Sequence, residues 1–323
     1  MKEKLIINGK GDEIVVLPAE GTRFTNKKIS LIDEEKMLEH CSNAVKLSRE
    51  QEVSQFTGEI ILNPTFDDLP AYIVAMCDEH KGSVGTDYEA INKVRSIIRE
   101  NPNFYEINAG DFVDNFNAVH KSALTGSLNE EILSPMAQAK LSGEIFKRMD
   151  KQGKLLTVLT GNHEKMSNVT FEYANTWLSD LSCPILKSGG ILTIKYGVQE
   201  YKIFLGHKYR GLGGQNPSNA FFNVVNDHPE VDVIILGHVH RKFISVFPRG
   251  GKMRTGIVGG SFKLDDEYSA DMGNPRDENN LGGITFTLNP KEHVIQVFQS
   301  AMEAEEAFKT QLEVKKLHAR KKN

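Results

Sequence analysis

The chain has 323 residues, a length that suits one large α/β domain with additions or two smaller domains. Hydrophobic residues make up 39% and charged residues 25%, which excludes a chain that is disordered throughout. The net charge of −4 means that overall charge does not predict nucleic-acid binding. No apolar run is long enough for a membrane span or a signal peptide. The three widely spaced cysteines favour a reducing, cytoplasmic location.

The first 68 residues differ from the rest of the chain and are interpreted as an N-terminal extension or small subdomain. Residues 5–7 and 14–17 are strand candidates on either side of a Gly-Lys-Gly turn. Residues 34–48 carry apolar and small side chains at helical spacing after an acidic first turn, which predicts an amphipathic helix. This part of the chain shows no pattern of residues that is typical of catalysis.

From about residue 69 onward, short apolar runs alternate with helical segments, a pattern that predicts α/β layering. Strands are expected at residues 71–77, 104–109, 155–160, 201–205 and 231–236. Helices are expected at residues 87–100, 135–151, 168–181 and 218–228. The second of these begins with Ser134 as N-cap and Pro135 at the first helical position. Later strand candidates, which we expect to form a second sheet, are residues 191–196, 243–247, 255–258, 284–288 and 293–299.

Two further segments complete the chain. Residues 260–283 are rich in Gly, Asp and Asn and predict a long loop of a length that is often functional. Residues 301–323 predict a helix that ends in a basic cluster, which can bind phosphates although such runs are usually solvated. We therefore expect an extension at 1–68, a main domain at 69–300 and a C-terminal helix with a basic tail at 301–323.

Each of five predicted strands is followed by polar residues that can bind a metal. These residues lie in the segments Asp78-Glu79-His80, Gly110-Asp111-Phe112-Val113-Asp114, Gly161-Asn162-His163-Glu164, Gly206-His207 and Gly237-His238-Val239-His240. Ligands gather at the carboxyl ends of strands in open α/β sheets, and glycine lets the backbone turn sharply there. Asp78 and His80 are two residues apart, so in an extended stretch both can reach one ion. Carboxylate, imidazole and amide groups suit Mn, Fe, Ni or Zn, and the two oxygens of Asp111 can bridge two ions.

Each of these segments is weak evidence by itself, since an Asp-x-His pair is usually a surface turn and a strand-end histidine usually belongs to a core or loop. Five such segments at the ends of predicted strands are hard to produce by chance. Two metals about 3.5–4 Å apart can polarise a phosphoryl group and ionise a water for in-line attack. The pattern therefore indicates a two-metal site for phosphoester chemistry.

In the order in which they occur, these motifs resemble those of the calcineurin-like metallophosphoesterase superfamily over about residues 70–260. The resemblance implies a four-layer α/β/β/α sandwich with a di-metal centre between strand-end loops. It implies that Asp78, His80, Asp111 and His240 hold the first metal, and that Asp111, Asn162, His207 and His238 hold the second. We expect Mn, with Fe, Ni or Zn as alternatives. Gly260-Ser261-Phe262 with Tyr268 also resembles uncharacterised phosphoesterases of bacteriophages and prophages.

Four further residues are candidates for catalysis. His163 matches the family's histidine that contacts the phosphate and can protonate the leaving oxygen. Glu164 or Asp114 can orient His163 or metal-bound groups, but Glu164 can equally be a first-turn helix carboxylate. Arg210 either contacts a phosphate from another loop or is a surface residue.

The resemblance implies two main substrate classes, phosphoproteins and the phosphodiesters cleaved by nucleases and nucleotide phosphodiesterases, and one departure from the family pattern weakens the first. The phosphoprotein phosphatases of this superfamily carry Arg-Gly after Gly-Asp-x-x-Asp, whereas this chain has Asn115-Phe116, so a bidentate Arg–phosphate contact is absent there. We therefore predict a phosphodiesterase acting on nucleic acid or a nucleotide, in which a hydroxide that bridges the metals attacks phosphorus and His163 assists the leaving group. The alternatives are a phosphomonoesterase or protein phosphatase, and a binding scaffold with a vestigial metal site. No feature predicts the oligomeric state.

Overall fold

A computed structural model describes residues 57–115, 134–166, 168–264 and 277–322, together with residues 39, 41–43 and 46. The chain divides into two compact units, Met1–Gln51 and Glu52–Asn323. The predicted strands at 5–7 and 14–17 and most of the predicted helix at 34–48 lie outside the described residues, although 39, 41–43 and 46 are helical. The domain boundaries stay a prediction, and strand β1 (Thr57–Leu62), which we assigned to the extension, pairs with a strand of the second unit.

The described strands of the second unit form two sheets. A six-stranded sheet has the order β1-β5-β6-β7-β9-β8, and a five-stranded sheet has the order β11-β10-β2-β3-β4. In the first, the strands after β1 are β5 (Gly189–Tyr196), β6 (Gln199–Gly206), β7 (Val233–Leu236), β8 (Lys242–Arg249) and β9 (Lys252–Gly259). In the second they are β2 (Ala71–Met76), β3 (Phe104–Asn108), β4 (Leu155–Val158), β10 (Ile284–Leu288) and β11 (Val297–Phe298). Strands β2, β3 and β4 run parallel, as do β6, β7 and β9, so within each set the carboxyl ends lie together.

The expectation that the later strands form a separate second sheet is wrong. Strand β10 lies antiparallel to β2 and extends the sheet of the earlier strands, whereas β5, β8 and β9 join β6 and β7. All five residues of β10 are buried, as expected for an interior strand that is covered on both faces. An apolar run indicates burial on both faces but does not identify the neighbouring strand, so the sequence pattern could not settle this pairing.

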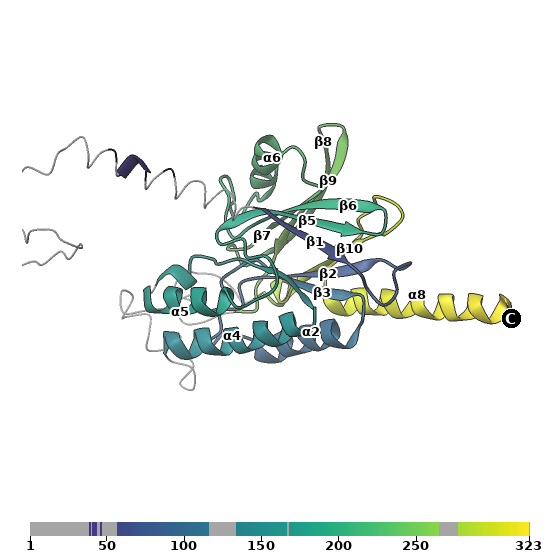
Figure 1. Cartoon of the computed structure of the whole chain (residues 1–323), viewed down its shortest axis with the longest axis horizontal. Coiled ribbons are helices and arrows are strands. Elements are labelled where there is room, and N and C mark those ends of the chain that lie inside the picture. The colour runs from purple at the N-terminus through teal and green to yellow at the C-terminus, as the bar shows by residue number, and fades with distance from the viewer. Residues whose placement is uncertain are drawn as a thin grey trace, which may run out of the picture. The chain divides into compact units, whose positions relative to one another are not determined.

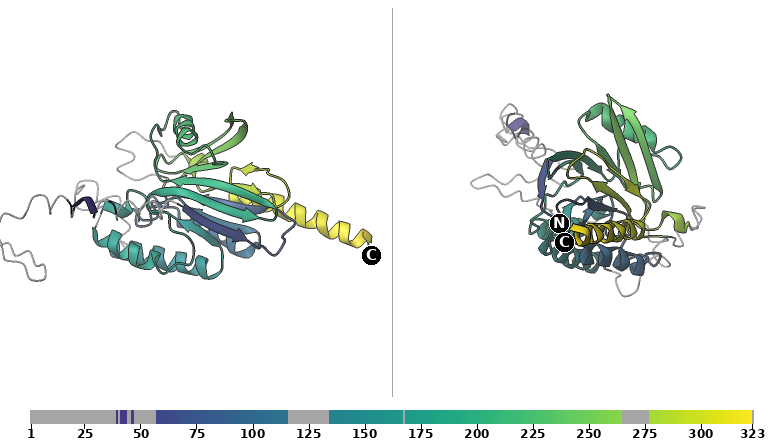
Figure 2. Two further views of the ribbon diagram at one scale, coloured as in Figure 1. Left: turned by 45° about the horizontal axis from the view of Figure 1, so that its top comes forward. Right: turned by 90° about the vertical axis from the view of Figure 1, so that its right-hand side faces the viewer.

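Helices cover the outer faces of both sheets (Figures 1 and 2). Their bounds are α2 (Tyr88–Glu100), α4 (Pro135–Lys151), α5 (Asn168–Leu178), α6 (Ser218–Asp227) and α8 (Ala301–Lys322), with short 3-10 helices η3 (Glu164–Met166) and η4 (Glu278–Asn280). Helices α2, α4, α5 and α8 share one apolar core with the five-stranded sheet, and α6 shares another with the six-stranded sheet. A third core lies between the two sheets. The predicted four-layer α/β/β/α arrangement is therefore confirmed.

Strand β2 shows how alternation produces these layers. Tyr72, Val74 and Met76 pack with the helices, whereas Ile73 and Ala75 pack between the sheets. Successive side chains of a strand point to opposite faces, so a strand covered on both sides needs an unbroken apolar run. The helix caps also follow the sequence, since the Ser134 hydroxyl accepts a hydrogen bond from the backbone N–H of Ala137 at 3.1 Å. In the described ranges no helix has both the length and the apolar character that a bilayer crossing requires.

Candidate metal centre

The polar residues after β2, β3, β4, β6 and β7 meet at one place in the structure. Seven side chains predicted as metal ligands are held together there, and we call them the strand-end cluster: Asp78, His80, Asp111, Asn162, His207, His238 and His240. They come from segments up to 162 positions apart in sequence (240 − 78). Their roles as ligands stay a prediction, which the geometry below supports.

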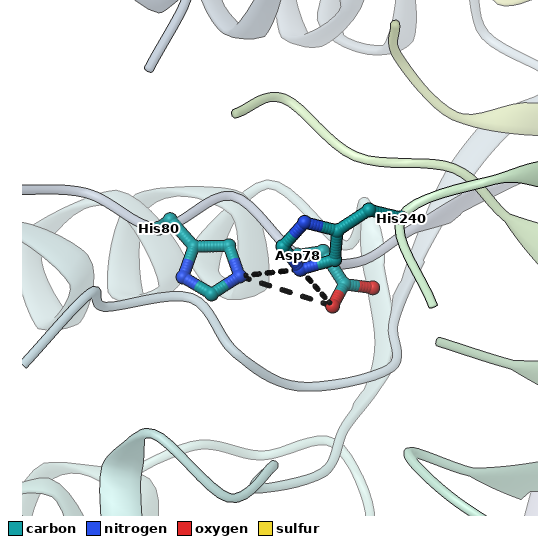
Figure 3. A group of neighbouring side chains, drawn as sticks. All are labelled: Asp78, His80 and His240. Atoms are coloured by element: carbon teal, nitrogen blue, oxygen red, sulfur yellow. Dashed lines mark hydrogen bonds and ion pairs between the residues drawn. The ribbon is translucent and has the colours of Figure 1, made fainter. Parts of the chain in front are cut away.

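The first part of the cluster consists of Asp78, His80 and His240 (Figure 3). The Nε2 atoms of the two imidazoles face each other at 2.9 Å. Asp78 Oδ1 lies 3.3 Å from His240 Nε2 and 3.9 Å from His80 Nε2. Ligand atoms bound at about 2.0–2.2 Å from one ion are separated from their neighbours by about 3 Å. These three donor atoms therefore fit one divalent cation.

The second part consists of Asp111, Asn162, His207 and His238. His207 Nε2 lies 2.9 Å from Asp111 Oδ2 and 3.1 Å from Asn162 Oδ1. The same amide oxygen lies 2.9 Å from His238 Nδ1. Asp111 Oδ2 is also 4.0 Å from His80 Nε2, so this carboxylate lies between the two parts. The arrangement fits a second cation, with Asp111 placed to bridge the pair.

The backbone of the cluster is unusual. Five of its non-glycine residues have φ in the left-handed region: Asp78 (51°), His80 (48°), Asp111 (52°), His238 (77°) and His240 (53°). Such conformations cost about 1–3 kcal/mol each and persist where surrounding contacts enforce them. Backbone hydrogen bonds from Asp78 N to Gly110 O and from His80 N to Asp111 O, both 3.0 Å, connect two of these loops. Backbone strain is therefore concentrated at the predicted ligands, as is common at functional sites.

Two glycines of the motifs have a different role from the one that we expected, which was to allow a sharp turn of the backbone. Gly161 and Gly237 do not have φ in the left-handed region. A Cβ on Gly161 would overlap Asp111 Oδ1, and a Cβ on Gly237 would lie 2.7 Å from Asp78 Oδ2. These glycines therefore make room for the carboxylates of the cluster. Gly110, with φ of +92°, does occupy the turn conformation that the sequence predicts.

The charges of the cluster are strongly coupled. Burial raises the pKa of Asp111, but the neighbouring His207 outweighs it and lowers this pKa to about 2. Burial lowers the pKa of His207, but Asp111 outweighs it and raises this pKa to about 9. Burial and the nearby imidazoles of His163 and His240 hold the pKa of His80 well below its usual value. His80 is therefore neutral at pH 7, the form in which an imidazole can bind a metal, and a cation that binds Asp111 and His207 would displace a proton.

His163 lies beside the cluster, next to His80 and Asp114, and its role as a non-ligand stays a prediction. Its Nδ1 makes a hydrogen bond with the backbone carbonyl of Asp114. Because a carbonyl only accepts, Nδ1 is the donor, and this assigns the tautomer. The other ring nitrogen, Nε2, lies 3.9 Å from Asp111 Oδ2. The His163 backbone N–H also donates to Asp111 Oδ1 at 2.9 Å, which fixes the ring next to the carboxylate that would bridge two metals.

Asp114 and Glu164 hold the loops of the cluster in place. Asp114 Oδ1 lies 3.0 Å from His80 Nδ1, so the carboxylate orients a predicted ligand. The fully buried Glu164 carboxylate accepts backbone N–H bonds from Gly161, Asp111 and Val113 at 2.6, 3.0 and 3.1 Å. Burial and the Asp111 charge raise the pKa of Glu164 to about 7. Glu164 therefore connects two ligand loops instead of acting only as a helix-end carboxylate.

Arg210 is not brought into the cluster. Its Nη2 donates to Asp227 Oδ1 at 2.6 Å, and its side chain is 62% exposed. Asp227 also accepts a hydrogen bond from Tyr209. The phosphate contact of Arg210 stays a prediction, and the observed ion pair favours the surface alternative.

Sequence reasoning missed the charges beneath the cluster. We call them the buried ion network: Glu79, Lys81, Arg95, Glu106 and Asn108, each at most 4% exposed. Arg95 donates to Glu79 at 2.7 and 2.8 Å and to Glu106 at 2.7 and 3.0 Å. Lys81 Nζ donates to Glu79 Oε2 at 2.8 Å, and Asn108 donates to Glu79 Oε1 at 2.8 Å. The signal was present, because Glu106 and Asn108 interrupt an apolar run and Arg95 lies on the apolar face of α2.

A second missed residue is Lys263, which comes from the predicted long loop. Its ammonium donates to Asp114 Oδ1 at 3.1 Å and is almost completely buried. Neighbouring residues attach this part of the loop to the ligand segment, since the backbone N–H of Phe262 donates to Asp78 O at 3.0 Å. No feature of the Gly-rich loop sequence indicated that a lysine would reach the site.

Comparisons with known proteins identify the family to which this chain is similar. The family model described as calcineurin-like phosphoesterase matches residues 72–242, which include the whole strand-end cluster. Vacuolar protein sorting 29 from Cryptosporidium parvum is 13% identical, with a TM-score of 0.38 over 72% of this chain and 97% of its own. A putative 5′-nucleotidase from Staphylococcus aureus is 14% identical, with a TM-score of 0.41 over 71% of this chain and 53% of its own. A predicted phosphoesterase from Streptococcus pneumoniae is 13% identical, with a TM-score of 0.32 over 71% of this chain and 98% of its own.

The search of curated proteins found no match. The family match covers more than half of the chain (171 of 323 residues) and contains every predicted ligand in the motif order. The chain therefore belongs to the calcineurin-like phosphoesterase family.

Proposed function

We propose that the protein is a two-metal phosphodiesterase that hydrolyses nucleic acid or a nucleotide. Family membership supports a hydrolase of phosphoesters. The observation that carries the proposal is the convergence of seven donor side chains from five strand ends, with His163 beside them as a histidine outside the predicted ligand set. A purely structural metal site has no need of such a histidine.

The donor set suggests which residues would hold each metal. Asp78, His80 and His240 would hold one ion, Asn162, His207 and His238 the other, and Asp111 both. Two divalent ions, for which we propose Mn, would polarise the phosphoryl group and lower the pKa of a bound water.

The protein's own contribution to the reaction centres on His163. The Asp114 carbonyl holds Nδ1 as a donor, so Nε2 is the nitrogen that would exchange a proton with the substrate. Nε2 carries a proton only when both ring nitrogens are protonated, so the imidazolium form of His163 is the form that would act as the acid. Nε2 faces the bridging carboxylate at 3.9 Å, so it lies next to the place where the phosphate would bind. In this proposal His163 protonates the leaving oxygen, and Asp114 and Glu164 keep the surrounding loops in position.

The preference for a diester rests on position 115. In this chain Asn115 is buried, and its Nδ2 donates to the His163 backbone carbonyl at 2.8 Å. Its backbone N–H donates to Gln138 Oε1, also at 2.8 Å. Asn115 therefore supports the loop of His163 at the position where the protein phosphatases carry a phosphate-binding arginine. The absence of that cation favours a substrate with less negative charge at the reacting phosphorus, which a diester has.

The proposal is tested by hydrolysis of bis-p-nitrophenyl phosphate and of p-nitrophenyl phosphate by the Mn-loaded protein. We expect kcat/KM to be higher for the diester. A preference for the monoester would favour the phosphomonoesterase alternative. Hydrolysis of neither compound, with Mn, Ni or Zn, would favour the binding scaffold.

The His163→Ala variant tests the assigned acid. Because His163 is not a predicted ligand, we expect unchanged metal content and a rate of diester hydrolysis lower by about 10²–10⁴-fold. The control is His318→Ala, which changes an exposed histidine of α8 and should leave the rate unchanged. Loss of metal together with activity in His163→Ala would contradict the assignment.

A further inference from the structure

A hollow of about 560 Å³ lies on the outer side of the six-stranded sheet and is lined mostly by apolar atoms. It is bounded by the start of β5, the end of β6 and the residue that follows α6. Three glycines, Gly189, Gly190 and Gly206, form part of its wall, so the backbone is accessible there without covering side chains. A volume of this size is within the range of pockets for small organic ligands.

The hollow and the candidate metal centre share the chain segment at the end of β6. Gly206 and Lys208, which line it, directly precede and follow the predicted ligand His207. Ser188, on its rim, accepts a hydrogen bond at 2.9 Å from Lys165, two residues after His163. The hollow and the cluster therefore share the chain segment around His207, although none of the seven cluster residues lines the hollow.

Aromatic side chains form one wall of the hollow, and a lysine lies at its rim. Phe204 lies with its ring centroid 5.2 Å from Tyr209 and 5.1 Å from His228, and all three residues line the hollow. Lys208 is exposed, and its ammonium has no hydrogen bond or ion pair with another described residue. Flat aromatic surfaces bind nucleobases by stacking, and a lysine ammonium binds phosphate. A nucleotide carries a base and a phosphate in one small molecule, so it can contact both the aromatic wall and the lysine.

We propose that this hollow binds the base of a nucleotide whose phosphate lies between Lys208 and the metal centre. This inference rests on the proposed function and narrows its substrate to phosphodiesters with a nucleoside on at least one side. An apolar side chain of a partner protein would use the aromatic wall but would leave Lys208 without a counterion. The charge at the rim therefore favours the nucleotide.

The test measures equilibrium binding to the full-length, metal-loaded protein by calorimetry. The ligands are the four deoxynucleoside monophosphates and, as a probe without a base, ribose 5-phosphate. Stacking of one base on an aromatic side chain contributes about 1–3 kcal/mol, so we expect at least one nucleotide to bind about 5- to 150-fold more tightly than ribose 5-phosphate. Equal affinity for all five ligands would overturn the proposal.

Two variants locate the binding. Lys208→Gln should weaken nucleotide binding about fivefold, and His228→Ala should reduce the advantage of nucleotides over ribose 5-phosphate. The matched control is Lys202→Gln, which removes a half-buried lysine of β6 that lies outside the lining of the hollow. Unchanged nucleotide binding in Lys208→Gln and His228→Ala would also contradict the proposal.

The outcome is separable from that of the proposed function. Hydrolysis of bis-p-nitrophenyl phosphate by the unmodified protein reports phosphodiesterase activity. If it is hydrolysed while nucleotides bind no better than ribose 5-phosphate, only the base site is wrong. If nucleotides bind selectively without any diester hydrolysis, only the proposed activity is wrong.

Discussion

Two sets of charged residues alternate along the same four positions of the chain. Asp78 and His80 point into the strand-end cluster, whereas Glu79 and Lys81 belong to the buried ion network. The network contains two carboxylates and two cations that bind one another at 2.7–3.0 Å. In the cluster, two imidazole nitrogens face each other at 2.9 Å beside a carboxylate. The charges of the network neutralise one another without a ligand, whereas the donor atoms of the cluster could hold cations.

The difference teaches that burial of charge by itself does not identify a functional site. Both groups contain deeply buried ionisable residues, and both have perturbed pKa values. What distinguishes the cluster is the left-handed backbone at five residues and the convergence of lone pairs from separate loops. The network instead stabilises the segment from which Asp78 and His80 project. Three predictions test this division of roles.

The largest effect is expected for Asp111→Asn. Removal of the carboxylate charge between the two parts of the cluster should abolish binding of at least one metal and lower diester hydrolysis by at least about 10³-fold. Metal content by mass spectrometry and the hydrolysis rate measure both consequences. Asp227→Asn, at an aspartate outside the cluster, is the control. A variant with full metal content and full rate would show that Asp111 does not bridge metals.

A smaller effect, on stability, is expected for Arg95→Met. The change leaves Glu79 and Glu106 buried without the guanidinium that binds both, and such broken pairs cost about 3–5 kcal/mol in free energy of unfolding. Denaturant unfolding measures this loss. Arg99→Met on the same helix is the control, since Arg99 is exposed. If Arg95→Met unfolds like the unmodified protein, the network does not stabilise the ligand segment.

The smallest effect is a difference between the strand-end cluster and the buried ion network in how their contributions to folding stability depend on pH. The folded-state pKa of His207 is raised from 6.5 to about 9 by Asp111, after the opposing effect of burial. The stability that this pair contributes is therefore complete below about pH 6.5 and is lost as the pH rises towards 9. For Glu79 burial raises the pKa, but Arg95 and Lys81 outweigh it and lower it from 4.5 to about 2. Its contribution is therefore complete above about pH 4.5 and is lost as the pH falls towards 2.

Melting temperatures of the metal-free protein between pH 6.5 and 9 measure the alkaline loss. We expect His207→Gln to remove it and added Mn to suppress it, because a bound cation replaces the proton on His207. An alkaline slope that is the same in His207→Gln as in the unmodified protein would place its origin outside the cluster.

The sequence predicted the parts of the fold and site that depend on local pattern. The parallel strands and the residues at their ends could be located because apolar runs, glycines and ligand types follow one another along the chain. The pairing of β10 with β2 and the contacts of Arg95 with Glu79 and Glu106 could not, because they join positions that only the folded chain brings together. Lys263 was missed for the same reason, since its loop has no periodicity. The sequence also did not show why positions 161 and 237 need glycine, because the need comes from the space that the Asp111 and Asp78 carboxylates occupy in the folded chain.

The most direct test of the central claim is the anomalous X-ray scattering of crystals of the Mn-loaded protein. The account predicts two peaks about 3.5–4 Å apart, with Asp111 between them, one beside Asp78, His80 and His240 and the other beside Asn162, His207 and His238. Peaks at any other place, or a cluster whose side chains remain bonded only to one another at saturating Mn, would contradict it.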